Sequence, residues 1–129
     1  YSFEITNAGS SFRTEAYFIS IANSNQFGNN FTIAPKASLS DGLLDVVVVK
    51  KMSKLRLLLT VLKQITKGDI SEYNEKTFHD KDVLYFQTDK LIIRNLDKAP
   101  LHIDGDPATT AGKFSFEIIP DAFKLIQPQ

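Results

Sequence analysis

The feature of this sequence that most constrains its fold is the apolar run at residues 43–49, which directly follows a tight polar turn. Four consecutive valines close the run, and their branched side chains favour extended backbone. A nearly continuous apolar run of this length predicts a strand that is central and buried. Ser40-Asp41-Gly42 suits a change of chain direction, and Pro35 stiffens the approach to it. The chain is therefore expected to fold around one buried β-strand.

Shorter stretches on both sides of this run alternate apolar and polar residues, which is the period of a half-buried strand. Residues 3–6 and 12–21 flank a turn cluster of about five residues, and together they predict a hairpin. Further strands are predicted at residues 31–33, 83–88, 90–94, 101–103, 114–119 and 123–126. Many short strands at close spacing indicate a mainly β fold, a β-sandwich of antiparallel strands.

Residues 53–67 change to a helical period. Ser53 suits the N-cap and Gly68 the position after the last turn, so one amphipathic helix is predicted within the β fold. Residues 50–67 also carry six basic and no acidic residues. The helix can pack its apolar face on the sheet, or it can lie on an anionic membrane surface. The residues of that face recur every three or four positions: Leu55, Leu58, Leu59, Leu62 and Ile65.

Length and composition set outer limits on function. A chain of 129 residues is one domain's worth. Its 15 basic and 15 acidic residues balance, so no overall charge favours nucleic acid as a partner. The absence of cysteine excludes disulfides, thiolate metal sites and a cysteine nucleophile, and it fits a cytoplasmic protein. A start without Met that already has the pattern of a strand predicts a piece of a longer protein.

Two familiar kinds of site are missing from the sequence. His79 and His102 are the only histidines, and neither is paired with a nucleophile in a pattern typical of a catalytic triad. The chain contains neither GxxxxGK[ST] nor GxGxxG, the glycine-rich loops that cradle phosphates. The chain by itself is therefore not expected to form a complete nucleotide site.

The turn at Asp41 is the first candidate site. Its carboxylate and the neighbouring backbone carbonyls offer the all-oxygen ligands that Mg²⁺ and Ca²⁺ prefer. The residues alone also allow a plain turn closed by Asp41-Gly42, with Asp45 in a salt bridge to Lys36 or Lys50. Both interpretations stay open at this level.

The second candidate is Asp104-Gly105-Asp106-Pro107, directly after a predicted strand. Two carboxylates two residues apart can reach one cleft, where one acts as general base or helps to hold Mg²⁺ beside a phosphate. The alternative is a hairpin turn whose aspartates bond their own backbone.

Taken together, these segments resemble the C-terminal domain of the diacylglycerol kinase family, which includes bacterial lipid kinases, sphingosine kinases and ceramide kinases. The most specific part is AP-x-A-x(3)-DGLLDV followed later by IDG and an acid. The resemblance implies the second, β-sandwich domain of a two-domain enzyme, here residues 1–129, with ATP bound mainly by a first domain whose Gly-Gly-Asp-Gly-Thr loop is absent from this chain. The matching segments are residues 21–23, 27–30, 33–37, 40–46, 102–106 and 116–120.

The resemblance also implies roles for particular residues. A structural Mg²⁺ would be held by the Asp41 carboxylate and the carbonyls of Ser38 and Leu43. Asp106 stands where the family has a catalytic Glu, and Asp104 is a second catalytic candidate. The shorter Asp106 side chain stops about one bond earlier, and a misplacement near 1 Å can cost about a hundredfold in rate.

The resemblance therefore implies an ATP-dependent lipid kinase that acts on a diacylglycerol-like or sphingoid acceptor at the inner face of the membrane. This chain alone is expected to be inactive. The alternatives are a non-catalytic module that binds a membrane or partner through residues 50–67, and an NAD kinase-like domain. The sequence predicts neither the acceptor lipid nor the oligomeric state.

Overall fold

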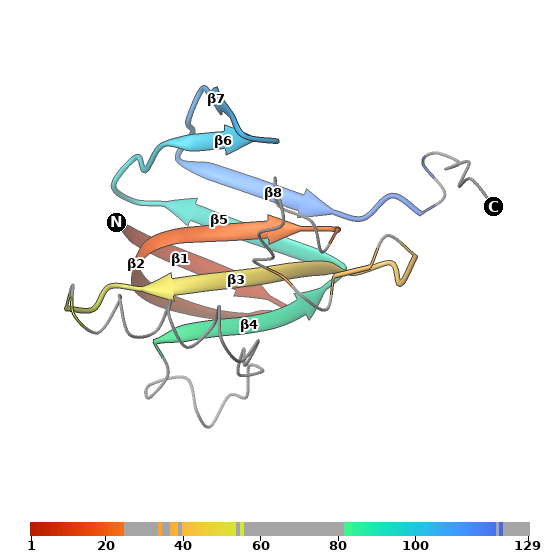
Figure 1. Cartoon of the computed structure of the whole chain (residues 1–129), viewed down its shortest axis with the longest axis horizontal. Helices are drawn as coiled ribbons and strands as arrows, with labels where there is room; N and C mark the ends of the chain where they lie inside the picture. Colours follow the sequence, from red (N-terminus) through yellow and green to blue (C-terminus); the bar gives the residue numbers. More distant parts are fainter. Residues whose placement is uncertain are drawn as a thin grey trace.

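A computed structural model of the chain describes residues 1–24, 34, 37, 38, 40–53, 55, 82–120 and 122. Within these residues the regular structure consists of β-strands, and Figure 1 shows their arrangement. The strands are β1 (Ser2–Asn7), β2 (Ser10–Ala22), β3 (Leu44–Lys50), β4 (Val83–Thr88), β5 (Lys90–Asn95), β6 (Leu101–Ile103), β7 (Asp106–Ala108) and β8 (Lys113–Glu117).

Six of the strands form one antiparallel sheet in the order β4-β3-β2-β1-β5-β8. The other two, β6 and β7, form a separate hairpin that rises beyond β8 in Figure 1. This hairpin interrupts the path from β5 to β8, which are neighbours in the sheet. It therefore projects from the chain between two strands that pair with each other.

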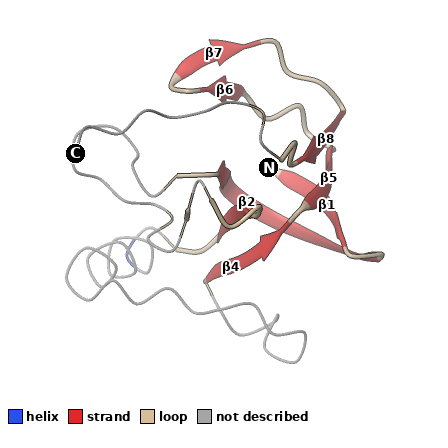
Figure 2. Ribbon diagram, turned by 90° about the vertical axis from the view of Figure 1, so that its right-hand side faces the viewer, coloured by secondary structure: helices blue, strands red, loops and turns tan. Residues whose placement is uncertain are grey.

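The long strand β2 divides the sheet into two halves. Its first part pairs with β1, and its second part pairs with β3. The register shifts between Ala16 and Phe18, so that Tyr17 is an extra residue, a β-bulge. Bulges bend a strand and increase its twist, which lets one strand pass from one layer of a sandwich to the other. Figure 2 shows the strong twist of these strands from the side.

The two halves share one apolar core. Phe3 and Ile5 of the first half pack in the same cluster as Val46 and Val48 of the second. The opposite face of β3 is also buried, because Val47 and Val49 pack with Ala34, Ala37 and Tyr85. Strand β3 is thus buried on both faces, as its continuous apolar run predicts.

The outer face of the first half is polar. Glu4 lies between Arg13 and Arg94, with Nε–Oε distances of 2.9 Å and 3.5 Å. These three residues come from the adjacent strands β2, β1 and β5, where side chains directly opposite each other can pair. Strands β1 and β5 therefore have buried apolar residues mainly on their inner face, whereas β3 has them on both faces.

The fold class is confirmed: the described residues form a mainly β, antiparallel structure. The turn between the first two strands is tighter than the predicted five-residue loop, because Asn7 pairs with Ser10 across Ala8-Gly9. Ala8 and Gly9 both have positive φ, 47° and 82°, which matches the right-handed twist of a two-residue hairpin. Strand β7 was not expected, since Pro107 is a turn signal in the sequence.

Some sequence predictions fall outside the described residues. The strands at residues 31–33 and 123–126 do, and so does the helix at 53–67 apart from Ser53 and Leu55, the latter 69% exposed. Within the described part of the chain, no helix is long and apolar enough to cross a membrane.

Candidate functional site

The turn at Asp41 leads directly into the buried strand β3 (Figure 1). The backbone N–H of Leu43 donates to Asp41 Oδ1 over 3.0 Å, so the side chain closes the turn. Gly42 has a φ of +71°, a conformation that glycine adopts without strain. Ser38 and Ser40 are joined through their hydroxyl groups, with an Oγ–Oγ distance of 3.1 Å. The Asp41 side chain therefore closes this turn, as one part of the plain-turn interpretation expects.

Behind this turn lies a buried carboxyl group. Asp45 is 0% exposed, and its Oδ1 accepts a hydrogen bond from the hydroxyl of Tyr85, itself 2% exposed. Gln87 Nε2 also donates to Asp45 Oδ1 and Oδ2, over 3.3 Å and 3.4 Å. Asp45 pairs directly with Gln87 in the β3–β4 register, while Lys50 ends the same strand. The expected salt bridge from Asp45 to Lys50 is therefore wrong, and Lys36 lies outside the described residues.

Gln87 links the two carboxyl groups of this region. Its Nε2 also lies 3.4 Å from Asp41 Oδ2, so one amide contacts both Asp41 and Asp45. The turn thus depends on the sheet, because Gln87 and Asp45 are held by strand pairing. Sequence reasoning missed Tyr85 and Gln87, although their alternation with apolar residues in 83–88 places them on the same face of β4.

The donor set at the Asp41 turn fits a hard cation. The Asx-type bond from Leu43 brings the Leu43 backbone close to the Asp41 carboxyl, and Asp41 itself is exposed. Carboxylate and carbonyl oxygens are the ligands that Mg²⁺ takes, together with water. Across the described residues, no three His, Asp or Glu side chains gather at one point. The ligand set that the resemblance implies, Asp41 with the carbonyls of Ser38 and Leu43, stays a prediction.

The second candidate site is the tip of the β6–β7 hairpin. Ile103 pairs with Asp106, so Asp104 and Gly105 alone form the turn. Their φ values, +51° and +94°, are those of a type I′ turn, in which Asp-Gly is a favoured pair. Asp104 and Asp106 are both exposed. The hairpin turn allowed by the sequence is therefore present, and the Asp106 side chain at its end is exposed.

The two candidate turns do not meet. In Figure 1 the turn before β3 lies at one side of the sheet, whereas the hairpin stands beyond β8. His102 is exposed on the hairpin opposite Pro107, and His79 lies outside the described residues. The described structure therefore contains two separate aspartate sites.

The base of the hairpin holds a residue that sequence reasoning missed. Asn95, the last residue of β5, is 4% exposed, and its side chain bonds to Ala99 and Thr110. The sequence does contain a signal for Asn95. Leu91, Ile93 and Asn95 occupy every second position of β5, so Asn95 falls on the same buried face as the two apolar residues. A polar side chain at a buried position of a strand requires hydrogen-bond partners.

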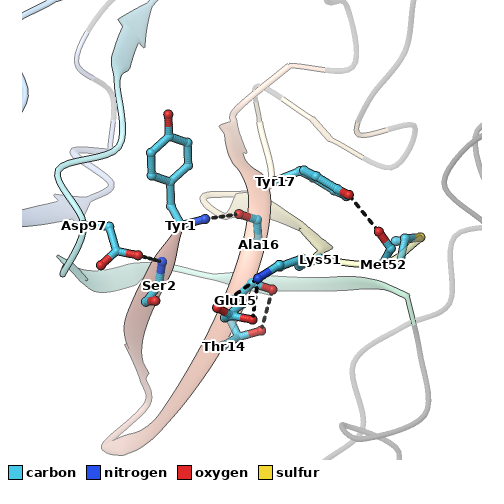
Figure 3. Close-up of polar contacts among 9 residues, drawn as sticks. All are labelled: Tyr1, Ser2, Thr14, Glu15, Ala16, Tyr17, Lys51, Met52 and Asp97. Atoms are coloured by element: carbon cyan, nitrogen blue, oxygen red, sulfur yellow. Dashed lines mark hydrogen bonds and ion pairs between the residues drawn. The ribbon is translucent and has the colours of Figure 1, made fainter. Parts of the chain in front are cut away.

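The same base carries a carboxyl group whose pKa is shifted. Hydrogen bonds from the side chain and the backbone N–H of Ser2 hold the pKa of Asp97 below its usual value of 3.8. The N–H of Ser2 lies 2.7 Å from Asp97 Oδ2, as Figure 3 shows. Asp97 thus ties the loop after β5 to the start of β1 while it is ionised.

Two solved chains from Bacillus anthracis share this fold. A diacylglycerol kinase of Bacillus anthracis strain Sterne superimposes with a TM-score of 0.65 at 18% identity, over 95% of this chain and 42% of that one. Another solved chain from the same organism gives a TM-score of 0.69 at 19% identity, over 92% of this chain and 36% of that one. This likeness shows the fold: a mainly β, antiparallel domain similar to part of these diacylglycerol kinase chains.

The family follows from the sequence comparison. The family model described as "YegS C-terminal NAD kinase beta sandwich-like domain" matches residues 1–127, so this chain belongs to that family. A protein of Shewanella frigidimarina named "Probable lipid kinase YegS-like" is 29% identical over 128 residues. The match covers 99% of this chain but only 38% of that protein, so the chain spans well under half the length of this relative. The resemblance to lipid kinases is therefore confirmed at the level of the family.

Proposed function

We propose that this chain is the second domain of an ATP-dependent lipid kinase and that it presents Asp106 to the hydroxyl group of the acceptor lipid. The observation that carries the proposal is the exposed type I′ hairpin, which displays Asp106 on a domain of the lipid-kinase family. In this proposal residues 1–129 form the C-terminal domain, and a first domain outside this chain binds ATP.

In such an enzyme ATP with Mg²⁺ supplies the phosphoryl group, and catalysis is mostly positioning and electrostatic stabilisation. Asp106 would accept the proton of the lipid hydroxyl, because an exposed carboxylate can reach a bound alcohol and act as general base. Asp104 would contribute mainly by closing the turn, since its φ of +51° suits Asp or Asn. Asp41, with the carbonyls of Ser38 and Leu43, would hold a second, structural Mg²⁺.

The test is a phosphoryl-transfer assay on the longer parent protein, with ATP, Mg²⁺ and a panel of lipid alcohols. The panel contains diacylglycerol, a sphingoid base, phosphatidylglycerol and an undecaprenyl-type alcohol, and NAD is added to test the NAD kinase alternative. We expect turnover of one lipid by the parent and none by the 129-residue chain alone. Turnover of NAD and of no lipid would contradict the proposal.

Matched variants assign the roles. Asp106→Asn should lower kcat of the parent about a hundredfold or more, because it removes the general base. Asp104→Asn should keep most activity, since Asn tolerates positive φ as well as Asp does. Asp89→Asn changes another exposed aspartate, between β4 and β5, and serves as the control. Full activity of Asp106→Asn would remove Asp106 from the mechanism.

A second candidate function is attachment to the inner face of an anionic membrane, and one observation favours it. Tyr17 and Phe18 are 40% and 45% exposed at the bulge in β2. The Tyr17 hydroxyl donates to the carbonyl of Met52 over 2.7 Å, which places the Tyr17 side chain beside the start of the basic segment 50–67 (Figure 3). Co-sedimentation with phosphatidylglycerol vesicles at low and high salt tests it, and salt-sensitive binding is expected.

A further inference from the structure

The β6–β7 hairpin cannot fix its own orientation. Each of its strands has three residues, and a two-stranded hairpin is at best marginally stable in water. It is separate from the six-stranded sheet, and within the described residues the chain connects the two through residues 96–100 and 109–112. The direction in which it presents Asp106 is therefore set at these two connections.

Both connections meet at the side chain of Asn95. Asn95 Oδ1 accepts from the N–H of Ala99 over 2.8 Å, and Nδ2 donates to the carbonyl of Ala99 over 3.0 Å. The same Nδ2 donates to Thr110 Oγ1 over 3.0 Å, and Thr110 Oγ1 donates to the Ala99 carbonyl over 2.6 Å. One amide thereby joins the connection that enters the hairpin to the one that leaves it.

The chemistry of this cluster fits a primary amide. Asn offers one carbonyl oxygen and two N–H groups, and all three are used at Ala99 and Thr110. A hydroxyl group can accept one bond while it donates another, as Thr110 does here. A carboxyl or apolar side chain at position 95 would lose the two donated bonds.

The sheet anchors the amide. The backbone N–H of Asn95 donates to the carbonyl of Gly112 over 3.0 Å, and that of Leu96 donates to the carbonyl of Ser2 over 3.1 Å. Asn95 also pairs with Phe3 in the β1–β5 register, and Phe3 belongs to the apolar core. The contacts of Asn95 therefore run from the rigid core to the base of the hairpin.

From this geometry we infer that Asn95, acting with Thr110, is a positioning residue that orients the hairpin carrying Asp106. The catalytic consequence rests on the function proposed above, whereas the structural consequence does not. Side chains in a satisfied buried network have one arrangement, so a hairpin held by this one has a defined direction. Without the network, the two connections could shift the hairpin by an ångström or more.

The test replaces Thr110 rather than the buried Asn95, so that the fold is disturbed least. Thr110→Val removes the hydroxyl at nearly constant volume, and Thr110→Ser keeps it. Thr6→Val is the control, because it removes a hydroxyl bonded to Ser11 on a distant hairpin. Amide order parameters and residual dipolar couplings are measured for residues 101–108 of the 129-residue chain.

We expect Thr110→Val to lower the order parameters of the hairpin from about 0.85 to below about 0.6, with Thr110→Ser and Thr6→Val near wild type. In the active parent, Thr110→Val should lower kcat about tenfold or more, since a misplacement near 1 Å can cost about a hundredfold. KM for ATP should stay constant, because the other domain binds ATP, and Thr110→Ser should restore kcat.

Unchanged hairpin couplings in Thr110→Val would overturn the inference, as would an unchanged kcat in an active parent. A wild-type parent that phosphorylates no lipid would count against the proposed function instead. The hairpin measurement would then decide the structural inference alone, so the two failures are distinguishable.

Discussion

The Asp41 turn and the β6–β7 hairpin both display an aspartate beside a glycine of positive φ, yet the molecule supports them differently. Behind the Asp41 turn stands a buried carboxyl group, Asp45, bonded to residues of β4. At the base of the hairpin lies a neutral amide, the side chain of Asn95, which is hydrogen-bonded to the backbone of Ala99 and to the hydroxyl group of Thr110.

Because one turn is supported by a carboxyl group and the other by an amide, the two sites should respond differently to cations and to pH. A region built on carboxyl groups is sensitive to cations and to the loss of an acceptor. A region built on an amide keeps its geometry over a wide pH range, since an amide does not titrate. The first arrangement agrees with the proposed structural ion site, and the second agrees with a fixed support for the hairpin that carries Asp106 in the proposed function.

The largest effect on stability is expected at Asp45. Asp45→Ala removes the acceptor of Tyr85 and Gln87 and should lower the free energy of unfolding by about 3 kcal/mol. Asp45→Asn keeps the shape and one acceptor, so its cost should be near 1 kcal/mol. Urea unfolding measures both, and a loss below about 0.5 kcal/mol in Asp45→Ala would mean that the cluster contributes little.

The next effect is a response to Mg²⁺ that only the Asp41 turn should show. At a free concentration ten times Kd, a bound ion stabilises the fold by about 1.4 kcal/mol, or about 5 °C in Tm. Asp41→Ala should abolish this gain, whereas Asp106→Asn, on the hairpin, should keep it. If wild-type Tm is the same in Mg²⁺ and in EDTA, the ion site does not exist.

Two matched glycine replacements compare the turns directly. Gly42 and Gly105 have φ values of +71° and +94°, and an added Cβ would meet nothing within 4 Å at either. Each Gly→Ala change should therefore cost about 1 kcal/mol of backbone strain alone. Gly42→Ala should lower the global Tm, because its turn leads into β3.

Gly105→Ala should instead increase hydrogen exchange within the hairpin and leave the global Tm nearly unchanged, because β6 and β7 lie outside the main sheet. Equal losses of Tm in the two variants would show that the hairpin is part of the same cooperative unit as the sheet.

The smallest effect is a pH dependence at the base of the hairpin. The pKa of Asp97 is lowered in the folded state, so its contribution to stability is complete above the ordinary value of 3.8. That contribution is lost as the pH falls through the lower folded-state value. Melting curves of wild type and Asp97→Asn should therefore differ near neutral pH, begin to converge as the pH falls below 3.8, and meet only below the lowered folded-state pKa. A constant difference down to pH 2 would contradict this assignment.

Much of the fold could be predicted from local patterns. The strands at residues 83–88 and 101–103 match the structure, and the central strand is displaced by one residue at each end. The alternation of apolar and polar residues and the preference of branched side chains for extended backbone both act over a few neighbouring residues. They can therefore be recognised from the sequence alone. Strand β7 was not predicted, because Pro107 was interpreted as a turn signal and a proline can also stand in a short edge strand.

The two candidate sites were recognised in the sequence as motifs. The buried residues that support them were not recognised. Asp41 and Asp106 stand in recognisable turns, whereas Asp45 does not form the salt bridge to Lys50 that the sequence allowed. Its true contacts, Tyr85 and Gln87, come from a strand about 40 residues away. Such contacts depend on register between strands, which no local pattern contains.

By itself, therefore, the amino-acid sequence determined most of the described strands, the two Asp-Gly turns and the resemblance to lipid kinases, because propensity and turn chemistry are local properties. Only the tertiary structure decided that β1 and β2 lie between β5 and β3 and that the two turns stand apart. It also decided that a buried carboxyl supports one turn and a buried amide the other. The physical reason is that both supports arise where distant strands and loops meet, and their hydrogen bonds exist only after the sheet has formed.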